Sequence, residues 1–418
     1  MKRSYRSHLG LASVCVLILM SLLPWTATAQ SATRTTEVLG TILTVDAENS
    51  SLVVNAFGQE QLAPVAADVQ VLNVEGQPLP NGLRAPELSG ADVTLTLGQV
   101  NGSLVITVIR LGSHIPDQQT ISGPSVGLKP LTELSATETY QGEDGGLYGG
   151  GRNEPPASHL AAARAATASI TPLNAVGERA SDGVIGFVSI SMSNATMEFS
   201  LFKELADLDE RKSGRVVIVD CAQGGQAMAQ WVDPNAPAWI EADRRLEAAE
   251  ISPEQVQVAW IKLANMMPIG DLDYHGRRLY DDTLVVLQNA KRRFPNLRIA
   301  YLGSRIYAGH ADGPLNPEPY AYEGAFVVRW LIQDQIEDAA PLRYDGAAGS
   351  GQTPLLLWGP YLWADGTTPR RSDGLIWERA DLAGDGVHPS ESGRRKVADL
   401  LLDYFTTDRL AQSWFTNP

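Results

Sequence analysis

Apolar and polar residues follow two different patterns in the two parts of this chain. Between residues 37 and 112, short runs such as Val93–Leu97 alternate apolar residues with polar residues or Thr, and Asn101-Gly102 marks a hairpin between the last two runs. Five or six such strands without a helical period predict a small all-β module, either a barrel or a sandwich. From about residue 183, short continuous apolar runs alternate with helical stretches instead.

The second pattern predicts a parallel sheet covered by helices. Its apolar runs have the length of strands that are buried on both faces: Val184–Ile190, Arg215–Val219, Val256–Ile261, Leu297–Leu302 and Pro354–Trp358. A last amphipathic helix follows Ser390, its expected N-cap. Five βα units predict an α/β domain with helices on both faces of the sheet. In such a sheet, a functional site lies just beyond the carboxyl ends of the strands.

The segment between the two patterns sets the expected domain boundary. Residues 113–136 carry Pro116 and Gly123-Pro124 with polar residues between them, which is typical of a linker. We therefore expect the β module over 37–112 and the α/β domain over 137–418, with its core at 183–410.

The first 29 residues have the features of a cleaved secretory signal. A basic start is followed by an apolar run and by Ala27-Thr28-Ala29, which fits the small-x-small cleavage pattern. A secreted or periplasmic protein is expected, and an N-terminal membrane anchor is the less favoured alternative. Beyond this segment the chain has one cysteine, Cys221, so no intramolecular disulfide is expected and the thiol is interpreted as a buried structural group.

Charge and histidine spacing narrow the class of partner. The chain has 33 Lys and Arg residues against 48 Asp and Glu residues, a net charge of −15. This charge repels phosphate backbones and anionic lipids, so neither nucleic acid nor a membrane surface is an expected partner. The remaining histidines show no metal-ligand spacing and no glycine-rich phosphate loop follows a strand, so neither a metal nor another cofactor is expected.

Residues that could catalyse a reaction follow the predicted strands. Asp385-Gly386-Val387-His388 stands directly before the last helix, and an Asp three residues before a His can orient its imidazole as a general base. The first strand of the domain runs into Ser191-Met192-Ser193, where a serine hydroxyl would lie at a helix N-terminus. Ser193 is the expected nucleophile, and Ser191 is the alternative.

Other strand ends offer hydrogen-bond donors and possible substrate contacts. The second strand runs into Gly224-Gly225, which lets the backbone approach a substrate and donate an N–H, and the third runs into Asn265, whose amide is a second donor. Arg305 follows the fourth strand, and Trp358 and Trp363 flank the loop after the fifth. All three are candidate substrate contacts, although aromatic residues more often pack in a core.

Ser, Gly, Asn and Asp-x-x-His at these strand ends, in this order, resemble the SGNH (GDSL-type) hydrolase superfamily over about residues 180–410. The resemblance implies a flavodoxin-like three-layer αβα fold and hydrolysis of carboxylic esters, including acetyl or short acyl groups on carbohydrates. It implies a catalytic triad of Ser193, His388 and Asp385, and an oxyanion hole of the Ser193 and Gly225 N–H groups and the Asn265 side chain. The β module loosely resembles small OB-like modules of bacterial exported proteins, which assigns no activity.

Two sequence blocks depart from the family pattern. Ser191-Met192-Ser193 stands where the family has Gly-Asp-Ser, and Leu263-Ala264-Asn265-Met266 stands where it has Gly-x-Asn-Asp. Each change removes an Asp outside the triad, which leaves catalysis possible. The sequence predicts a secreted, metal-independent serine esterase from a divergent branch. The alternative is a non-catalytic carbohydrate- or envelope-binding protein on a degenerate hydrolase scaffold.

Overall fold

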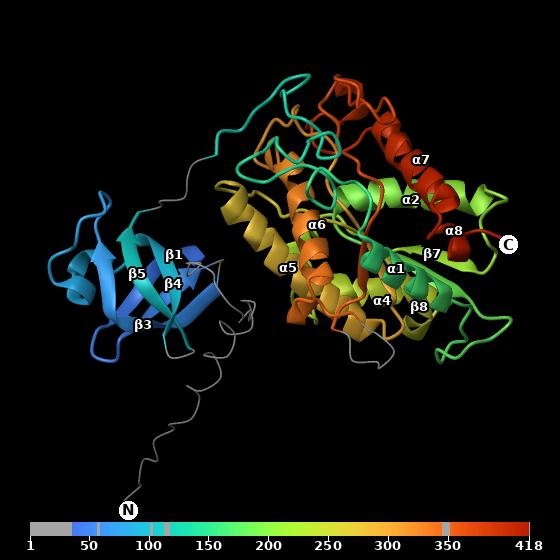
Figure 1. Ribbon diagram of the computed structural model, residues 1–418. Helices are drawn as coiled ribbons and strands as arrows, with labels where there is room; N and C mark the ends of the chain where they lie inside the picture. The colour runs from blue at the N-terminus through green and yellow to red at the C-terminus, as the bar shows by residue number, and fades with distance from the viewer. Residues whose placement is uncertain (1–35, 57–58, 101–102, 113–117, 345–351, 418) are drawn as a thin grey trace, which may run out of the picture. The chain divides into compact units, whose positions relative to one another are not determined.

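The computed structural model describes residues 36–56, 59–100, 103–112, 118–344 and 352–417 (Figure 1). The predicted secretory signal and the Asn101-Gly102 turn lie outside these residues. The chain divides into two compact units, the first ending at Asp117 and the second beginning at Gln118. None of the described helices is both long and apolar enough to cross a bilayer.

The first unit is a closed five-stranded barrel, one of the two architectures that its alternating pattern predicts. Its strands are β1 (Thr36–Asp46), β2 (Ser51–Ala56), β3 (Gln59–Leu72), β4 (Asp92–Val100) and β5 (Ser103–Leu111). They close in the order β1-β2-β3-β5-β4, with β3 and β5 parallel and the other pairs antiparallel. Inward-facing residues such as Ile42, Leu52 and Ile109 are fully buried and form its core.

The second unit contains the five predicted parallel strands. They are β6 (Ile185–Ile190), β7 (Val216–Asp220), β8 (Val256–Lys262), β9 (Ile299–Gly303) and β10 (Leu355–Trp358). The sheet order is β10-β9-β8-β6-β7. Counted within this sheet, the order is 2-1-3-4-5, the doubly wound order in which the chain reverses its direction of crossing between β6 and β8. The carboxyl ends of these two neighbouring strands therefore form the expected position of a site.

Helices cover both faces of the sheet. They are α1 (Ala157–Ser169), α2 (Ser193–Leu208), α3 (Met228–Trp231), α4 (Pro237–Ala248), α5 (Leu272–Arg293), α6 (Tyr320–Ile336), α7 (Glu391–Thr407) and α8 (Gln412–Phe415). Helix α2 packs against α7 and α5 packs against α6 (Figure 1). The chain crosses the sheet in one direction from β6 to β7, and in the other direction from β7 to β8, β9 and β10. Right-handed crossovers therefore place α2 on one face and α4, α5 and α6 on the other. The α/β class predicted from the sequence is thus observed.

The linker prediction was wrong for the described residues 118–136. Asp365, near the end of the sheet, accepts hydrogen bonds from the Ser125 hydroxyl (2.5 Å) and the Val126 N–H (2.7 Å). Leu131 is fully buried in the core of the second unit. Residues 118–136 thus form an irregular strap, whose backbone groups have hydrogen-bond partners in the α/β unit. The Pro and Gly content of the segment does not reveal these contacts.

Candidate active site

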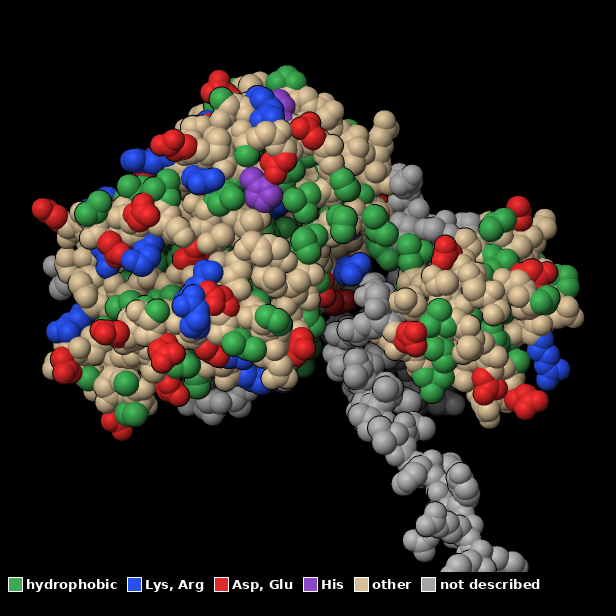
Figure 2. All heavy atoms as spheres, turned by 180° about the vertical axis from the view of Figure 1, so that it is seen from behind, with side chains coloured by type: hydrophobic (Ala, Val, Ile, Leu, Met, Phe, Trp, Pro, Cys, Tyr) green, Lys and Arg blue, Asp and Glu red, His purple; other side chains and the backbone are tan. Residues whose placement is uncertain are grey.

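The carboxyl ends of the parallel strands bring the predicted serine and histidine together. Helix α2 begins at Ser193, whose Oγ lies 2.7 Å from Nε2 of His388. Ser191, the alternative nucleophile, is fully buried, and its hydroxyl donates to the Lys262 carbonyl in the core. One face of the α/β unit exposes histidine side chains with acidic and hydrophobic side chains beside them (Figure 2). Of the two candidate serines, Ser193 is the one in contact with a histidine.

Asp385 completes the chain of contacts. Its Oδ2 lies 2.5 Å from Nδ1 of His388, and its Oδ1 accepts the N–H groups of Val387 and His388 at 3.0 Å each. Partial burial raises the pKa of Asp385, but the hydrogen bonds from the His388 side chain and these N–H groups outweigh it and lower the pKa to about 2. An ionised Asp385 accepts a hydrogen bond from Nδ1–H of His388 and so leaves Nε2 free to accept the proton of Ser193.

The turn that carries Asp385 and His388 is tightly packed. Gly386 has φ of +67°, and a Cβ atom there would lie 1.6 Å from the His310 carbonyl oxygen, so no other residue fits without moving the backbone. The Val387 carbonyl accepts from the Asn194 amide (2.9 Å) and from the Arg305 guanidinium (3.3 Å). The turn is thereby tied to the first turn of α2, which carries the serine.

Arg305, Trp358 and Trp363, the predicted substrate contacts, are all buried. Arg305 is 3% exposed and lies under the histidine turn, where it contacts the Val387 carbonyl. Trp358 is 4% exposed and Trp363 is fully buried. Their indole N–H groups donate to the Leu147 carbonyl and the Glu318 carboxyl group, at 2.8 Å each. A ring in the core offers no face on which a sugar could stack, so the structure gives no support to sugar stacking on Trp358 or Trp363.

Gly225 lies in an exposed turn after β7. Its φ is +74°, and a Cβ atom there would meet nothing within 4 Å. Its N–H has no acceptor within the part of the chain that the structure describes, and neither has the Ser193 N–H, which belongs to the first residue of a helix. The Gln223 N–H donates to the Ser191 carbonyl at 3.0 Å and so joins this turn to the start of α2. Two free backbone donors are thus available at this edge.

Asn265, the third predicted donor, is held at both ends of its side chain. Its Oδ1 accepts the Ala229 N–H at 3.0 Å, and its Nδ2 donates to Oδ2 of Asp282 at 2.5 Å. The apolar residues that follow it are exposed: Met266 by 37%, Met267 by 61% and Ile269 by 48%. Asp282 was not predicted from the sequence, because a carboxylate inside a long helix looks like any solvated residue.

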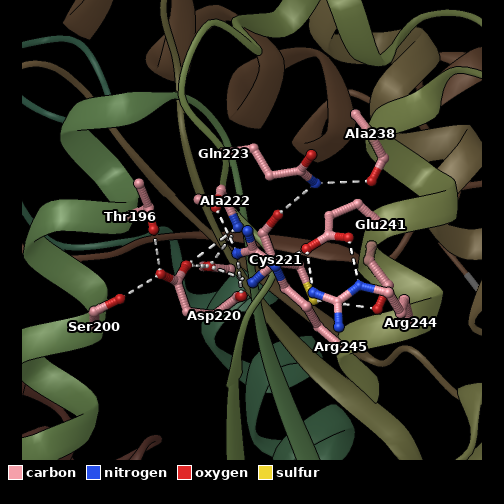
Figure 3. A network of polar contacts seen from close by, with 12 residues as sticks. Thr196, Ser200, Asp220, Cys221, Ala222, Gln223, Ala238, Glu241, Arg244 and Arg245 are labelled. Carbon is pink, nitrogen blue, oxygen red and sulfur yellow. Dashed lines mark hydrogen bonds and ion pairs between the residues drawn. The ribbon is translucent and has the colours of Figure 1, made fainter. Parts of the chain in front are cut away.

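Asp220 is a second residue that the sequence analysis missed. Its carboxylate accepts the hydroxyls of Ser189 (2.5 Å), Thr196 (2.5 Å) and Ser200 (2.6 Å), and so joins the ends of β6 and β7 to α2 (Figure 3). Burial raises the pKa of Asp220, and the three hydroxyls oppose that rise. The sequence did contain a signal for Asp220, because an acidic residue directly follows an apolar run at the edge of the sheet where a site is expected.

The described residues offer little for a metal ion. Within these ranges, no three or more His, Cys, Asp or Glu side chains come together in a way that could hold one.

Cys221 is buried beside this edge, and burial raises the pKa of its thiol. The thiol is therefore protonated and has no nucleophilic character here.

Comparison with known proteins finds only remote similarity. No protein-family model and no curated protein matches the chain. Among solved structures, it is similar to a protein from Bacteroides fragilis provisionally named an acylhydrolase, with 12% identity and a TM-score of 0.32 over 62% of this chain and 100% of that one. It is also similar to a protein from Streptococcus pneumoniae provisionally named a platelet activating factor, with 14% identity and a TM-score of 0.26 over 59% of this chain and 90% of the other. The function of this chain therefore has to be inferred from its own site.

Proposed function

We propose that this protein is an exported serine esterase that hydrolyses carboxylic esters. The observation that carries the proposal is the continuous contact from Ser193 Oγ to His388 Nε2 (2.7 Å) and from His388 Nδ1 to Asp385 (2.5 Å). His388 takes the proton of Ser193 as its Oγ attacks the ester carbonyl, and Asp385 stabilises the resulting imidazolium. His388 then gives this proton to the departing alcohol. Water, activated by the same histidine, releases the acid and restores the serine.

The negative charge on the carbonyl oxygen needs donors that are already in place. The N–H groups of Ser193 and Gly225 and the amide of Asn265 supply them in this proposal. Preorganised donors at the carbonyl oxygen are the largest single contribution to catalysis in many acyl-transfer enzymes. The free backbone N–H groups at residues 193 and 225 support this role.

The proposal includes membership in a divergent branch of the SGNH superfamily, with its three-layer αβα fold. Two observations support it. The strand order is 2-1-3-4-5, and Ser193, Gly225 and Asn265 follow the ends of three adjacent strands. The residues 1–29 support export, through their signal-like pattern.

The acyl group of the substrate is proposed to be apolar. Met266, Met267 and Ile269 expose apolar side chains directly after Asn265, in a chain with 48 Asp and Glu residues against 33 Lys and Arg residues. Exposed apolar clusters beside a site mark ligand contacts more often than scattered single residues do. The burial of Trp358 and Trp363 removes the aromatic surface that would have favoured a sugar.

Labelling with a fluorophosphonate tests the proposal, because the reagent reacts with activated serines. The wild-type chain should be labelled and should hydrolyse short-chain aryl esters, and Ser193→Ala should lose both activities. Ser191→Ala is the matched control and should keep most of its activity, because Ser191 Oγ bonds to a backbone carbonyl in the core. A folded wild-type chain without labelling or hydrolysis would favour the alternative, a non-catalytic carbohydrate- or envelope-binding protein.

A further inference from the structure

The orientation of the Asn265 side chain is chemically determined. Its Oδ1 lies 3.0 Å from the Ala229 N–H, which can only donate, and its Nδ2 lies 2.5 Å from a carboxylate oxygen of Asp282. Exchanging the oxygen and nitrogen of the amide would place a donor against a donor. Nδ2 has two hydrogens, and one is used by Asp282. The other is left for a third partner.

The two residues that hold Asn265 come from a rigid frame. Ala229 belongs to α3 and Asp282 to α5. The Asn289 amide on α5 donates to the Trp231 carbonyl at 3.1 Å and to the Val232 carbonyl at 2.7 Å, which ties the two helices together. The residue directly after Asn265 is Met266, which offers no strong acceptor. The acceptor for the Asn265 amide is therefore supplied by Asp282 on the next helix, α5, 17 residues further along the chain.

We propose that Asp282 is a positioning residue of the esterase, holding the Asn265 carboxamide so that its second N–H points at the developing oxyanion. The inference rests on the proposed function. An oxyanion donor is effective when it lies about 2.7–3.1 Å from the position that the charged oxygen will occupy. Without Asp282 the carboxamide keeps its bond to Ala229 but gains freedom to tilt about it. A displacement of about 1 Å at a reacting group can cost about 100-fold in rate.

The test compares Asp282→Ala with Asp282→Asn in the full chain, using aryl ester hydrolysis. Asp282→Ala should lower kcat by about 10- to 100-fold with little change in KM, because the donor acts in the transition state. Asp282→Asn should restore most of kcat, since its amide oxygen accepts the same hydrogen bond. Asp281→Asn is the matched control. It changes the adjacent carboxylate on α5, for which the described residues show no bond to Asn265, and it should keep kcat.

A double-mutant cycle separates positioning from a structural role. If Asp282 acts only through Asn265, the double variant Asn265→Ala/Asp282→Ala should have the kcat of Asn265→Ala alone. Losses that multiply would overturn the inference, and so would an Asp282→Ala chain with wild-type kcat and only a lower melting temperature. A wild-type chain that is neither labelled by fluorophosphonate nor active on any ester would overturn the proposed function together with this inference. An active wild type with an unaffected Asp282→Ala variant would overturn this inference alone.

Discussion

Asn265 shows how one side chain combines a structural and a proposed catalytic role. Asn265→Ala should lower kcat by about 10²–10³, the range for losing one oxyanion donor, while KM changes little. The structure adds that the Ala229 N–H and Asp282 would lose a partner, so the melting temperature should also fall. Ester hydrolysis well below the melting temperature, together with thermal unfolding, measures both effects. A near-normal kcat with a large loss of stability would contradict the oxyanion role.

Asp281 gives the fold a predictable dependence on pH. Burial, followed by repulsion from Asp282, raises its pKa from 3.8 to about 7. Between these pH values the folded chain binds a proton that the unfolded chain has released, so this group makes the free energy of unfolding fall as the pH rises. Above about pH 7 the loss is complete.

Replacing this carboxyl group isolates its contribution. The difference in unfolding free energy between wild type and Asp281→Asn should decline from about pH 4 to about pH 7 and stay level above it. Urea denaturation of both chains across this range measures the difference. A constant difference, or one that grows with pH, would show that Asp281 does not have a raised pKa in the folded chain.

At the scale of elements, two polar anchors, one fully buried and one part-buried, fix α2 at the edge of the sheet. Glu198 on α2 and Lys262 at the end of β8 are both fully buried, and Nζ lies 2.7 and 2.6 Å from the two carboxylate oxygens. The second anchor is Asp220, which accepts hydroxyls from the first two turns of the same helix. The proposed nucleophile therefore stands on a helix whose start is held from β7 and β8, the two strands that flank β6.

Removing the Asp220 anchor should affect both stability and rate. Asp220→Ala should lower the free energy of unfolding by about 2–4 kcal/mol, because three buried or part-buried hydroxyls lose their shared carboxyl acceptor. kcat should fall as well, since Ser193 moves with the helix. Asp207→Ala on the same helix is the control: it removes ion pairs with Lys203 and Lys212 from a carboxylate that is 39% exposed, and it should cost about 1 kcal/mol or less. Chemical denaturation and ester hydrolysis of both variants measure these effects. Equal losses of unfolding free energy and of kcat in the two variants would contradict the anchoring role of Asp220.

The loop after β8 should determine the preference for acyl length. Met266, Met267 and Ile269 expose apolar surface beside the proposed oxyanion donor, so kcat/KM should rise about twofold for each methylene from acetate to hexanoate esters, less than full burial would give. The combined variant Met266→Gln/Met267→Asn/Ile269→Thr should keep acetate hydrolysis and lose this rise. Asn suits position 267, whose φ is +48°. An unchanged chain-length profile in the variant would place the acyl group elsewhere.

At the scale of the whole molecule, the boundary between the units predicts which shortened chain is stable. A chain that begins at Gln118 should fold and keep the kcat of the full chain on small esters, because the α/β unit starts there. A chain that begins at Ser135 lacks the Ser125 bond to Asp365 and the buried Leu131, so its melting temperature should be much lower. Thermal unfolding and ester hydrolysis compare the two. Equal stability would show that residues 118–134 do not support the fold.

Much of the α/β unit and of its candidate site could be predicted from the sequence by itself. Strands buried on both faces must be continuously apolar, and parallel strands must alternate with helices, so their positions appear in the order of residues. All carboxyl ends of such a sheet lie at one edge. That rule was sufficient to expect Ser193, Gly225 and Asn265 on the same edge, and the three-residue spacing before the last helix was sufficient to pair His388 with Asp385.

Only the tertiary structure decided the features that depend on contacts between distant segments. Asp282 reaches Asn265 because α5 packs beside α3, and no local pattern distinguishes this carboxylate from its neighbour Asp281. The positions of Trp363 and of the strap at 118–136 depend on the residues of the α/β unit that pack against them. Sequence periodicity reports which face of an element is apolar, whereas burial of an irregular segment depends on what packs against it.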